Sequence, residues 1–218
     1  LKNLKWMDEE TKKAALVKLN SMKFIVGYPD ELLNDSIIIE EYKGVYDQFV
    51  DENLFESDMK IRRWFWHREL KKYRKPEDRH DWRKSTSVAI VNAFYSPLSN
   101  TIILPAGILQ GVFFNKKNTE SINYGAIGTI IGHEITHGFD DQGSQFNYNG
   151  DLEDWWTVQT KHTFQQKKDL IVKQYSKFVE PLTGLHLNGN NTQGENIADN
   201  GGVILSYRAA FADNNFEK

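Results

Sequence analysis

Cysteine is absent from the 218-residue chain. The protein therefore forms no disulfide bond and offers no thiolate to a metal ion, so any metal site must use histidine, aspartate or glutamate. The absence of cysteine is more typical of a reducing compartment than of secretion, which it nevertheless allows.

Long apolar runs and a strong excess of one charge are also missing. No run approaches the ~20 residues that span a bilayer, and no signal peptide is visible at the start. Lysine and arginine number 27 and aspartate and glutamate 30, which leaves a net charge of −3. This balance gives no reason to expect a nucleic-acid partner or an anionic membrane surface. The length suffices for one large domain or two small ones.

Helical spacing of apolar residues begins close to the N-terminus. It predicts a helix over residues 4–20 and a second helical region over about residues 37–73. We expect the aromatic residues of the second region to lie in a core. The candidates for buried positions are Trp6, Ala14, Leu16 and Leu19 in the first helix and Tyr46, Phe49, Phe55, Trp64 and Trp66 in the second region.

The composition of the chain changes near residue 85. Residues 87–91 and 101–104 are short, apolar and β-branched, which predicts two strands, and the asparagine and proline of residues 92–97 predict a turn that joins them as a hairpin-like pair. The rest of the pattern predicts helices over residues 124–139, 151–177 and 195–212 and a loop over residues 184–194.

The most informative motif is His133-Glu134-Ile135-Thr136-His137. Two histidines four positions apart project from one face of a helix, so their ring nitrogens can bind one zinc ion. Glu134 lies between them, where it can take a proton from a zinc-bound water. Three glycines precede the first histidine in the same predicted helix, and we interpret them as places where another backbone packs closely: Gly125, Gly128 and Gly132.

A catalytic zinc site usually has three protein ligands, so the third must come from elsewhere in the chain. Glu195, which follows a glycine-rich loop and begins a predicted helix, is the best candidate. Its position leaves two interpretations open, a metal ligand or a charge that stabilises the helix N-terminus. Asp199, one turn later, and Asp140 suit carboxylates that accept a histidine N–H, although Asp199 is alternatively a solvated side chain. The other histidines lack ligand spacing, and we expect them to be exposed or hydrogen-bonded: His67, His80, His162 and His186.

Eight segments along the chain carry a resemblance to a known family. They are residues 6–8, 27–29, 91–95, 104–110, 131–141, 150–156, 186–189 and 194–202. In this order they resemble the catalytic region of the neprilysin family of zinc endopeptidases, which also contains the endothelin-converting enzymes. The resemblance covers nearly the whole chain.

The resemblance implies an α+β, mostly helical fold, that of a thermolysin-like zinc peptidase catalytic domain with a central HExxH helix and a small sheet. It implies one Zn²⁺ ion held by His133, His137 and Glu195. Glu134 and Asp199 would be the catalytic residues, with Asp199 orienting a ligand histidine.

The resemblance also implies that Asp140 orients a ligand histidine and that Asn92 and Ala93 bind the substrate backbone along a strand edge. It predicts hydrolysis of short peptides on the amino side of hydrophobic residues, by Glu-assisted attack of a zinc-bound water. The family favours an extracellular location, either secreted or as the ectodomain of a single-pass membrane protein. The absence of cysteine favours the alternative, the cytoplasm, and the oligomeric state stays undefined.

The chain also departs from the family pattern. In the family, a histidine well downstream of the third ligand donates to the developing oxyanion and a later arginine binds substrate, whereas no histidine follows Glu195 here. A large helical domain that precedes this region in the family is also missing. We therefore expect a fragment in which residues 1–84 form the helical N-terminal part and residues 85–218 the zinc-binding catalytic core, truncated at its C-terminal end. The alternative function is a zinc-binding but catalytically incomplete module that binds peptides or protein partners.

Overall fold

The computed structural model describes residues 1, 3–45, 48, 53–76, 78–79, 81–84 and 87–212. The chain forms two compact units, a larger one of Leu1–Gly27 with Thr86–Lys218 and a smaller one of Tyr28–Ser85. The change of composition near residue 85 coincides with a boundary between them. Residues 1–27, which the sequence groups with the N-terminal part, belong instead to the larger unit.

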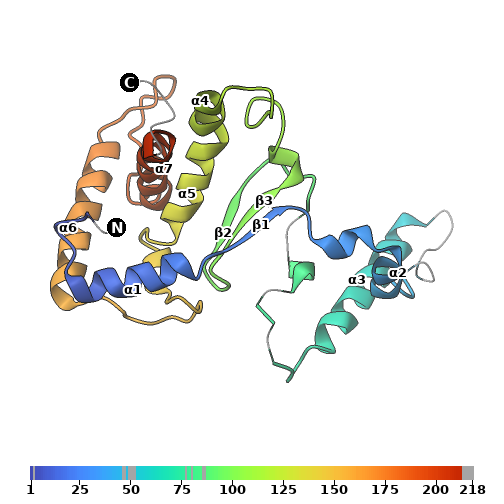
Figure 1. Ribbon diagram of the computed structural model, residues 1–218. Coiled ribbons are helices and arrows are strands. Elements are labelled where there is room, and N and C mark those ends of the chain that lie inside the picture. Colours follow the sequence, from blue (N-terminus) through green and yellow to red (C-terminus); the bar gives the residue numbers. More distant parts are fainter. Residues whose placement is uncertain are drawn as a thin grey trace. The chain divides into compact units, whose positions relative to one another are not determined.

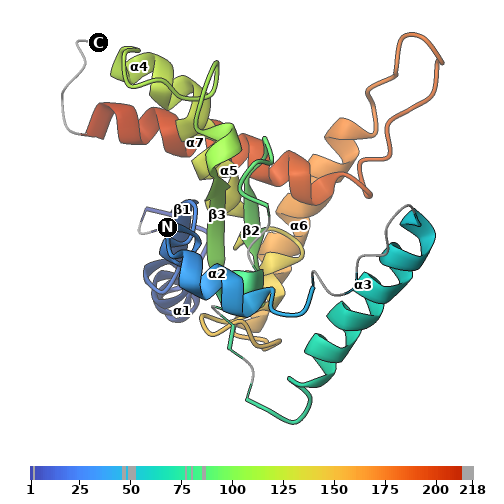
Figure 2. The same ribbon diagram turned by 90° about the vertical axis from the view of Figure 1, so that its right-hand side faces the viewer.

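The larger unit is mostly helical with one small sheet, as the sequence predicts (Figure 1). Figure 1 shows α5 beside the sheet. Both views place α7 and α6 on the side of α5 that faces away from the sheet (Figure 2). The elements of this unit are α1 (Glu9–Asn20), β1 (Lys23–Gly27), β2 (Phe94–Ser96), β3 (Thr101–Pro105), η4 (Ala106–Ile108), α4 (Glu120–Asn123), the π-helical segment η5 (Tyr124–Gly128), α5 (Thr129–His137), η6 (Gly143–Gln145), α6 (Val158–Tyr175) and α7 (Gln193–Ala212).

The sheet has the strand order β1-β3-β2, with β1 parallel and β2 antiparallel to β3. The central strand β3 is almost entirely buried, as expected for a short strand covered on both faces. Among the described residues β2 pairs only with β3, so its other side is an edge of the sheet. The core packs between the sheet and the helices, and its buried members are Met22, Ala93, Ile102, Leu104, Ile108 and Ile127.

One strand lies where the sequence predicts a turn. The prediction for residues 101–104 is confirmed by β3, but the prediction of a strand over residues 87–91 is wrong. Its partner is β2, within the segment predicted as the turn, because Phe94 and Tyr95 have the side chains that strands favour and pair with Ile103 and Ile102. Residues 87–91 form turns instead, held where the N–H of Gly107 donates to the carbonyl of Val88.

Helix ends follow local capping that periodicity does not show. α1 begins at Glu9 rather than residue 4 because Asp8 is its N-cap, and α6 begins at Val158 rather than residue 151 because Thr157 is its N-cap. The helix predicted over residues 124–139 consists of the π-helical η5 followed by α5. The helix predicted over residues 195–212 is confirmed by α7.

Asp8 connects the N-termini of α1 and α6. Its carboxylate accepts hydrogen bonds from the backbone N–H of Thr11 at 2.8 Å and from the hydroxyls of Thr157 and Thr160. These hydrogen bonds, with that from Thr11 first, hold the pKa of Asp8 well below its usual range, although burial opposes the shift. The carboxylate therefore stabilises the folded state only while it is ionised.

We expect Asp8→Asn to lower the melting temperature by roughly 2–4 °C at neutral pH and by less in acid. The folded-state pKa lies below the unfolded value of 3.8. The contribution of the carboxylate is therefore complete above about pH 5 and is lost as the pH falls toward the folded-state pKa. Melting curves between about pH 2.5 and 7 measure this, with Glu10→Gln, an exposed acidic residue of the same helix turn, as the control. A constant difference between Asp8→Asn and wild type at every pH would contradict the prediction.

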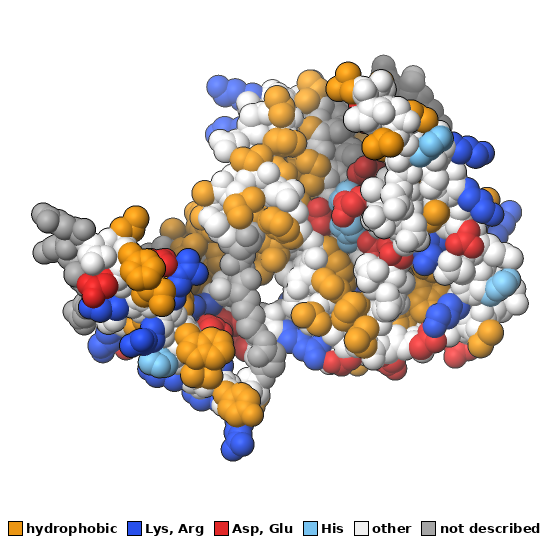
Figure 3. Space-filling model, turned by 180° about the vertical axis from the view of Figure 1, so that it is seen from behind, with side chains coloured by type: hydrophobic (Ala, Val, Ile, Leu, Met, Phe, Trp, Pro, Cys, Tyr) orange, Lys and Arg blue, Asp and Glu red, His pale blue; other side chains and the backbone are white. Residues whose placement is uncertain are grey.

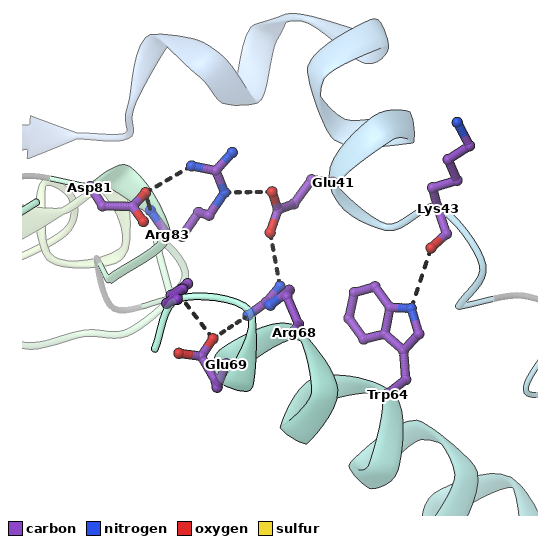
Figure 4. Close-up of polar contacts among 8 residues, drawn as sticks. Glu41, Lys43, Trp64, Arg68, Glu69, Asp81 and Arg83 are labelled. Carbon is purple, nitrogen blue, oxygen red and sulfur yellow. Dashed lines mark hydrogen bonds and ion pairs between the residues drawn. The ribbon is translucent and has the colours of Figure 1, made fainter. Parts of the chain in front are cut away.

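The smaller unit is held together by ion pairs around Glu41 (Figure 4). Its elements are η1 (Asp30–Leu33), α2 (Asp35–Glu41), α3 (Leu54–Leu70) and η3 (Trp82–Lys84). The Glu41 carboxylate, whose side chain is only 10% exposed, binds Arg68 of α3 at 2.9 Å and Arg83 of η3. Arg83 also contacts Asp81 at 2.9 Å. One carboxylate thus links three elements of this unit.

The aromatic residues of this unit are less buried than the sequence predicts. Trp64 is half-buried and donates its indole N–H to the carbonyl of Lys43 at 3.3 Å (Figure 4). The prediction is wrong for Phe55 and Trp66, which are 75% and 63% exposed, because two helices and short turns cannot bury every apolar side chain they carry. Tyr46 and Phe49 lie outside the described residues. None of the described helices has the length and apolar composition needed to cross a membrane.

Candidate functional site

The site is built where α5 and α7 pack backbone to backbone. A Cβ atom added at Gly202 of α7 would lie 2.6 Å from the carbonyl oxygen of Thr129 and 2.9 Å from the backbone nitrogen of His133. One added at Gly132 of α5 would lie 2.8 Å from the carbonyl oxygen of Gly202. Only glycine allows this approach. The predicted close packing is therefore present at Gly132, whereas Gly125 has no neighbour within 4 Å.

This packing brings together three side chains that could hold a metal ion. The Nε2 atoms of His133 and His137 lie 3.3 and 3.6 Å from Oε2 of Glu195. One donor atom from each of the three residues lies within 4.8 Å of the others. The two imidazole rings stand nearly perpendicular, at 85°, with their centroids 4.5 Å apart. The three side chains are therefore close enough together to hold one metal ion.

Each histidine is held by a carboxylate on its other ring nitrogen. Nδ1 of His133 lies 2.8 Å from Oδ1 of Asp199 on α7, and Nδ1 of His137 lies 2.7 Å from Oδ2 of Asp140. Such contacts place the proton on Nδ1 and leave the Nε2 lone pair free for a metal. Asp140 is itself fixed, because its Oδ1 accepts the N–H groups of Gln142 at 2.8 Å and Gly143 at 2.7 Å.

The two carboxylate supports differ in exposure. The Asp140 side chain is 5% exposed, whereas that of Asp199 is 71% exposed. Burial lowers the pKa of His137, but the hydrogen bond to Asp140 and the charges of Asp140, Glu134 and Glu195 outweigh it and raise the pKa above its ordinary value. The negative charge of these carboxylates therefore favours a cation beside His137.

Glu134 occupies the floor of a cavity of about 700 Å³. It is 5% exposed, and burial raises the pKa of its carboxyl, with the charge of Glu195 adding to the shift and the two histidines opposing it. Figure 3 shows acidic and histidine side chains gathered in a hollow, with hydrophobic side chains along one flank. The cavity lining includes Asn92, Ala93, Tyr95, His133, His137, Asp140, Asn190, Gln193 and Glu195.

The structure thus brings every predicted site residue except Asp199 to the wall of one cavity, with Asp199 behind His133. Sequence reasoning did not single out Tyr95, Asn190 and Gln193, which also line the cavity. Tyr95 lies within a motif segment, and the other two lie directly beside one. Three of the remaining histidines, His67, His162 and His186, are exposed as predicted. His80 lies outside the described residues.

The donor set suits zinc. Two imidazole nitrogens and one carboxylate oxygen are ligands that zinc commonly takes in catalytic sites, which keep a fourth position open. The carboxylates on both Nδ1 atoms are the supports that such ligands usually have. The cavity lies directly beside the three donors.

Comparison with known proteins decides the family. A model of peptidase family M13 matches residues 92–218. The chain belongs to peptidase family M13. The resemblance to the neprilysin family is therefore confirmed.

Relatives of this M13 chain include neprilysins from distant animals. Neprilysin-2 of Drosophila melanogaster is 47% identical over 216 residues, and neprilysin of Homo sapiens is 46% identical over 211 residues. Both alignments cover 96% of this chain, but only 27% and 28% of the respective relatives. The chain therefore spans little more than a quarter of their length.

Solved structures confirm the fold. The zinc metalloprotease Zmp1 of Mycobacterium tuberculosis, solved with an inhibitor, superposes with a TM-score of 0.80 at 33% identity, over 97% of this chain and 32% of that one. PepO of Lactobacillus rhamnosis gives a TM-score of 0.79 at 33% identity, over 95% of this chain and 31% of that one. The α+β, mostly helical architecture around the HExxH helix is thus that of M13 peptidases.

Proposed function

We propose that this M13 chain is the metal-binding part of a zinc endopeptidase that hydrolyses short peptides. The observation that carries the proposal is the convergence of His133, His137 and Glu195 beside the buried Glu134, with Asp199 and Asp140 behind the histidines. The family membership supports the same reaction class. A zinc ion at these donors would polarise the scissile carbonyl and make water a nucleophile near neutral pH.

Each residue of the site has a separate proposed role in the reaction. His133, His137 and Glu195 are the proposed metal ligands, and Asp199 and Asp140 orient the histidines. The Glu134 carboxylate takes a proton from the attacking water and delivers it to the nitrogen of the leaving amine. A carboxyl whose pKa is raised by burial suits both transfers, because it accepts and releases a proton closer to neutral pH.

The substrate backbone is proposed to lie along the free edge of β2. Asn92 and Ala93 directly precede this strand and line the cavity, and an exposed strand edge can pair with an extended peptide. The hydrophobic side chains flanking the hollow (Figure 3) suit a hydrophobic side chain of the substrate. We propose cleavage on the amino side of that residue from the resemblance to the neprilysin family. The family favours action outside the cell, in secreted or membrane-anchored form, with short peptides as the partners.

Metal analysis of this chain and peptide cleavage by the complete protein test the proposal. We expect one zinc per chain in wild type and less than about 0.1 in His133→Ala, because loss of one of three ligands leaves an incomplete site. The complete protein should cleave a quenched fluorescent peptide, and His133→Ala should abolish cleavage. The control is His162→Ala, an exposed histidine on α6. Zinc binding with no cleavage in the complete wild type would favour the alternative, a binding module, and zinc retained by His133→Ala would contradict the ligand set.

A further inference from the structure

Lys18 on α1 carries a buried ammonium group. It contacts residues that lie more than 100 positions later in the chain. The residue is 1% exposed, and its Nζ donates hydrogen bonds to the carbonyl oxygens of Gly143 at 2.6 Å and Phe146 at 2.7 Å. The rings of Phe139, Trp155 and Tyr95 surround the same nitrogen at 5.6, 5.9 and 6.0 Å from their centroids. An ammonium ion among three aromatic faces gains cation–π attraction, although it gives up hydration.

The carbonyls that Lys18 holds belong to the turn that follows α5. The N–H of Gly143 donates to Oδ1 of Asp140, and Oδ2 of Asp140 lies 2.7 Å from Nδ1 of His137. The same peptide segment is therefore held from both sides, by Lys18 through the Gly143 carbonyl and by Asp140 through the Gly143 N–H. A continuous series of hydrogen bonds runs from α1 to a proposed metal ligand.

Removing the charged Lys18 ammonium from water lowers the stability of the folded state, whereas an apolar side chain at this position would not have this desolvation cost. Burial lowers the pKa of Lys18 to about 8, with the charge of Asp140 opposing the shift. The ammonium form, which donates stronger hydrogen bonds than a neutral amine, is thus still the main form at neutral pH. An unbranched apolar residue such as methionine would occupy similar space without this desolvation. What methionine cannot do is hold the two carbonyls.

We propose that Lys18 is a positioning residue of the metal site, which fixes the turn of residues 140–146 and, through Asp140, the orientation of His137. The proposal rests on the proposed zinc-binding function. Lys18 touches neither metal nor substrate, so its effect is on how well the histidine is preset for binding. Loss of a group that hydrogen-bonds a metal ligand typically weakens metal binding about 10–100-fold, so a residue that acts through such a group should fall at the lower end of this range.

Zinc affinity of the Lys18→Met variant, measured by competition with a fluorescent chelator at pH 7, tests the proposal. We expect zinc binding about tenfold weaker than in wild type. Lys13→Met, an exposed lysine of the same helix, should bind as wild type does. Ile108→Ala provides the second control, because it removes a core side chain of η4 and should lower the melting temperature without changing zinc affinity. Wild-type affinity in Lys18→Met, or an equal loss in Ile108→Ala, would overturn the proposal.

Amide hydrogen exchange in the zinc-free protein separates this proposal from the proposed function. We expect the Gly143 amide to exchange about tenfold faster in Lys18→Met, whereas the amide of Ile127, bonded to the Phe113 carbonyl elsewhere in the larger unit, should be unchanged. If the wild type binds no zinc but the Gly143 amide still exchanges faster in Lys18→Met than in the wild type, the series of hydrogen bonds is supported and the zinc site is refuted. Unchanged exchange would refute the positioning role. If Lys18→Met does not fold, Lys18→Gln replaces it, because the glutamine amide can donate to one carbonyl. This variant should show a zinc affinity and a Gly143 exchange rate between those of the wild type and those expected for Lys18→Met. Wild-type values of both in Lys18→Gln would overturn the proposal.

Discussion

Replacing Glu134 with glutamine in the complete protein is expected to lower kcat for peptide cleavage roughly 10²–10⁴-fold, the usual contribution of a general base. Zinc content should stay at one per chain. The amide has nearly the same size as the carboxylate but cannot accept the proton of the attacking water, and the three proposed ligands are unchanged. Glu134 is 5% exposed on the cavity floor, so bulk water does not readily replace it.

A quenched fluorescent peptide with leucine after the scissile bond measures this effect, alongside elemental analysis for zinc. Glu120→Gln is the matched control, since Glu120 is an exposed glutamate in α4 of the same unit. An unchanged kcat in Glu134→Gln would show that another group moves the proton. Loss of zinc together with activity would mean that Glu134 supports the metal rather than the proton transfer.

Gly202→Ala should damage the metal site without touching any proposed ligand. The added methyl would lie 2.6 Å from the carbonyl oxygen of Thr129 and 2.9 Å from the backbone nitrogen of His133. Both neighbours are backbone atoms, so α5 and α7 must move apart. We expect a loss of about 1–3 kcal/mol in the free energy of unfolding and zinc binding weaker by about 100-fold, because Glu195 and Asp199 move with α7.

Gly125→Ala is the control for this substitution. Its Cβ would have no neighbour within 4 Å, so the variant should bind zinc normally and gain up to about 1 kcal/mol from the lower entropy of the unfolded chain. Denaturant unfolding and chelator competition on both variants give the comparison. Normal zinc affinity in Gly202→Ala would show that the two helices tolerate separation and that their contact does not set the site.

Local features were the ones that sequence predicted well. His133 and His137 follow from the four-residue helical spacing, and α7 and β3 from their periodicity and composition. The role of Glu195 depended on the resemblance, because it lies on another helix and spacing within one helix cannot place two helices side by side. Its proposed role, like those of the other site residues, stays a prediction until metal binding is measured.

Features that depend on tertiary contacts were missed. The apolar pattern of α1 pointed to leucine and alanine as its buried face, whereas Lys18 is among the largest fully buried side chains. A buried lysine needs partners for its ammonium group. Here the carbonyls and aromatic rings around that group come from residues 95–155, which the pattern of α1 alone does not reveal. The strand β2 was missed for a related reason, since the pairing partner decides whether residues 87–91 or 94–96 form the edge.

The division of the metal site between α5 and α7 would make a bound ion a cross-link. Glu195 follows His137 by 58 positions in a chain without cysteine, so an ion held by both closes a loop that no disulfide can close. The ligand set exists only while α7 is docked, and binding therefore stabilises that state alone, by about 2.7 kcal/mol when free zinc exceeds the Kd a hundredfold. The lifetime of the docked helix, and with it resistance to proteases, would then follow the supply of zinc.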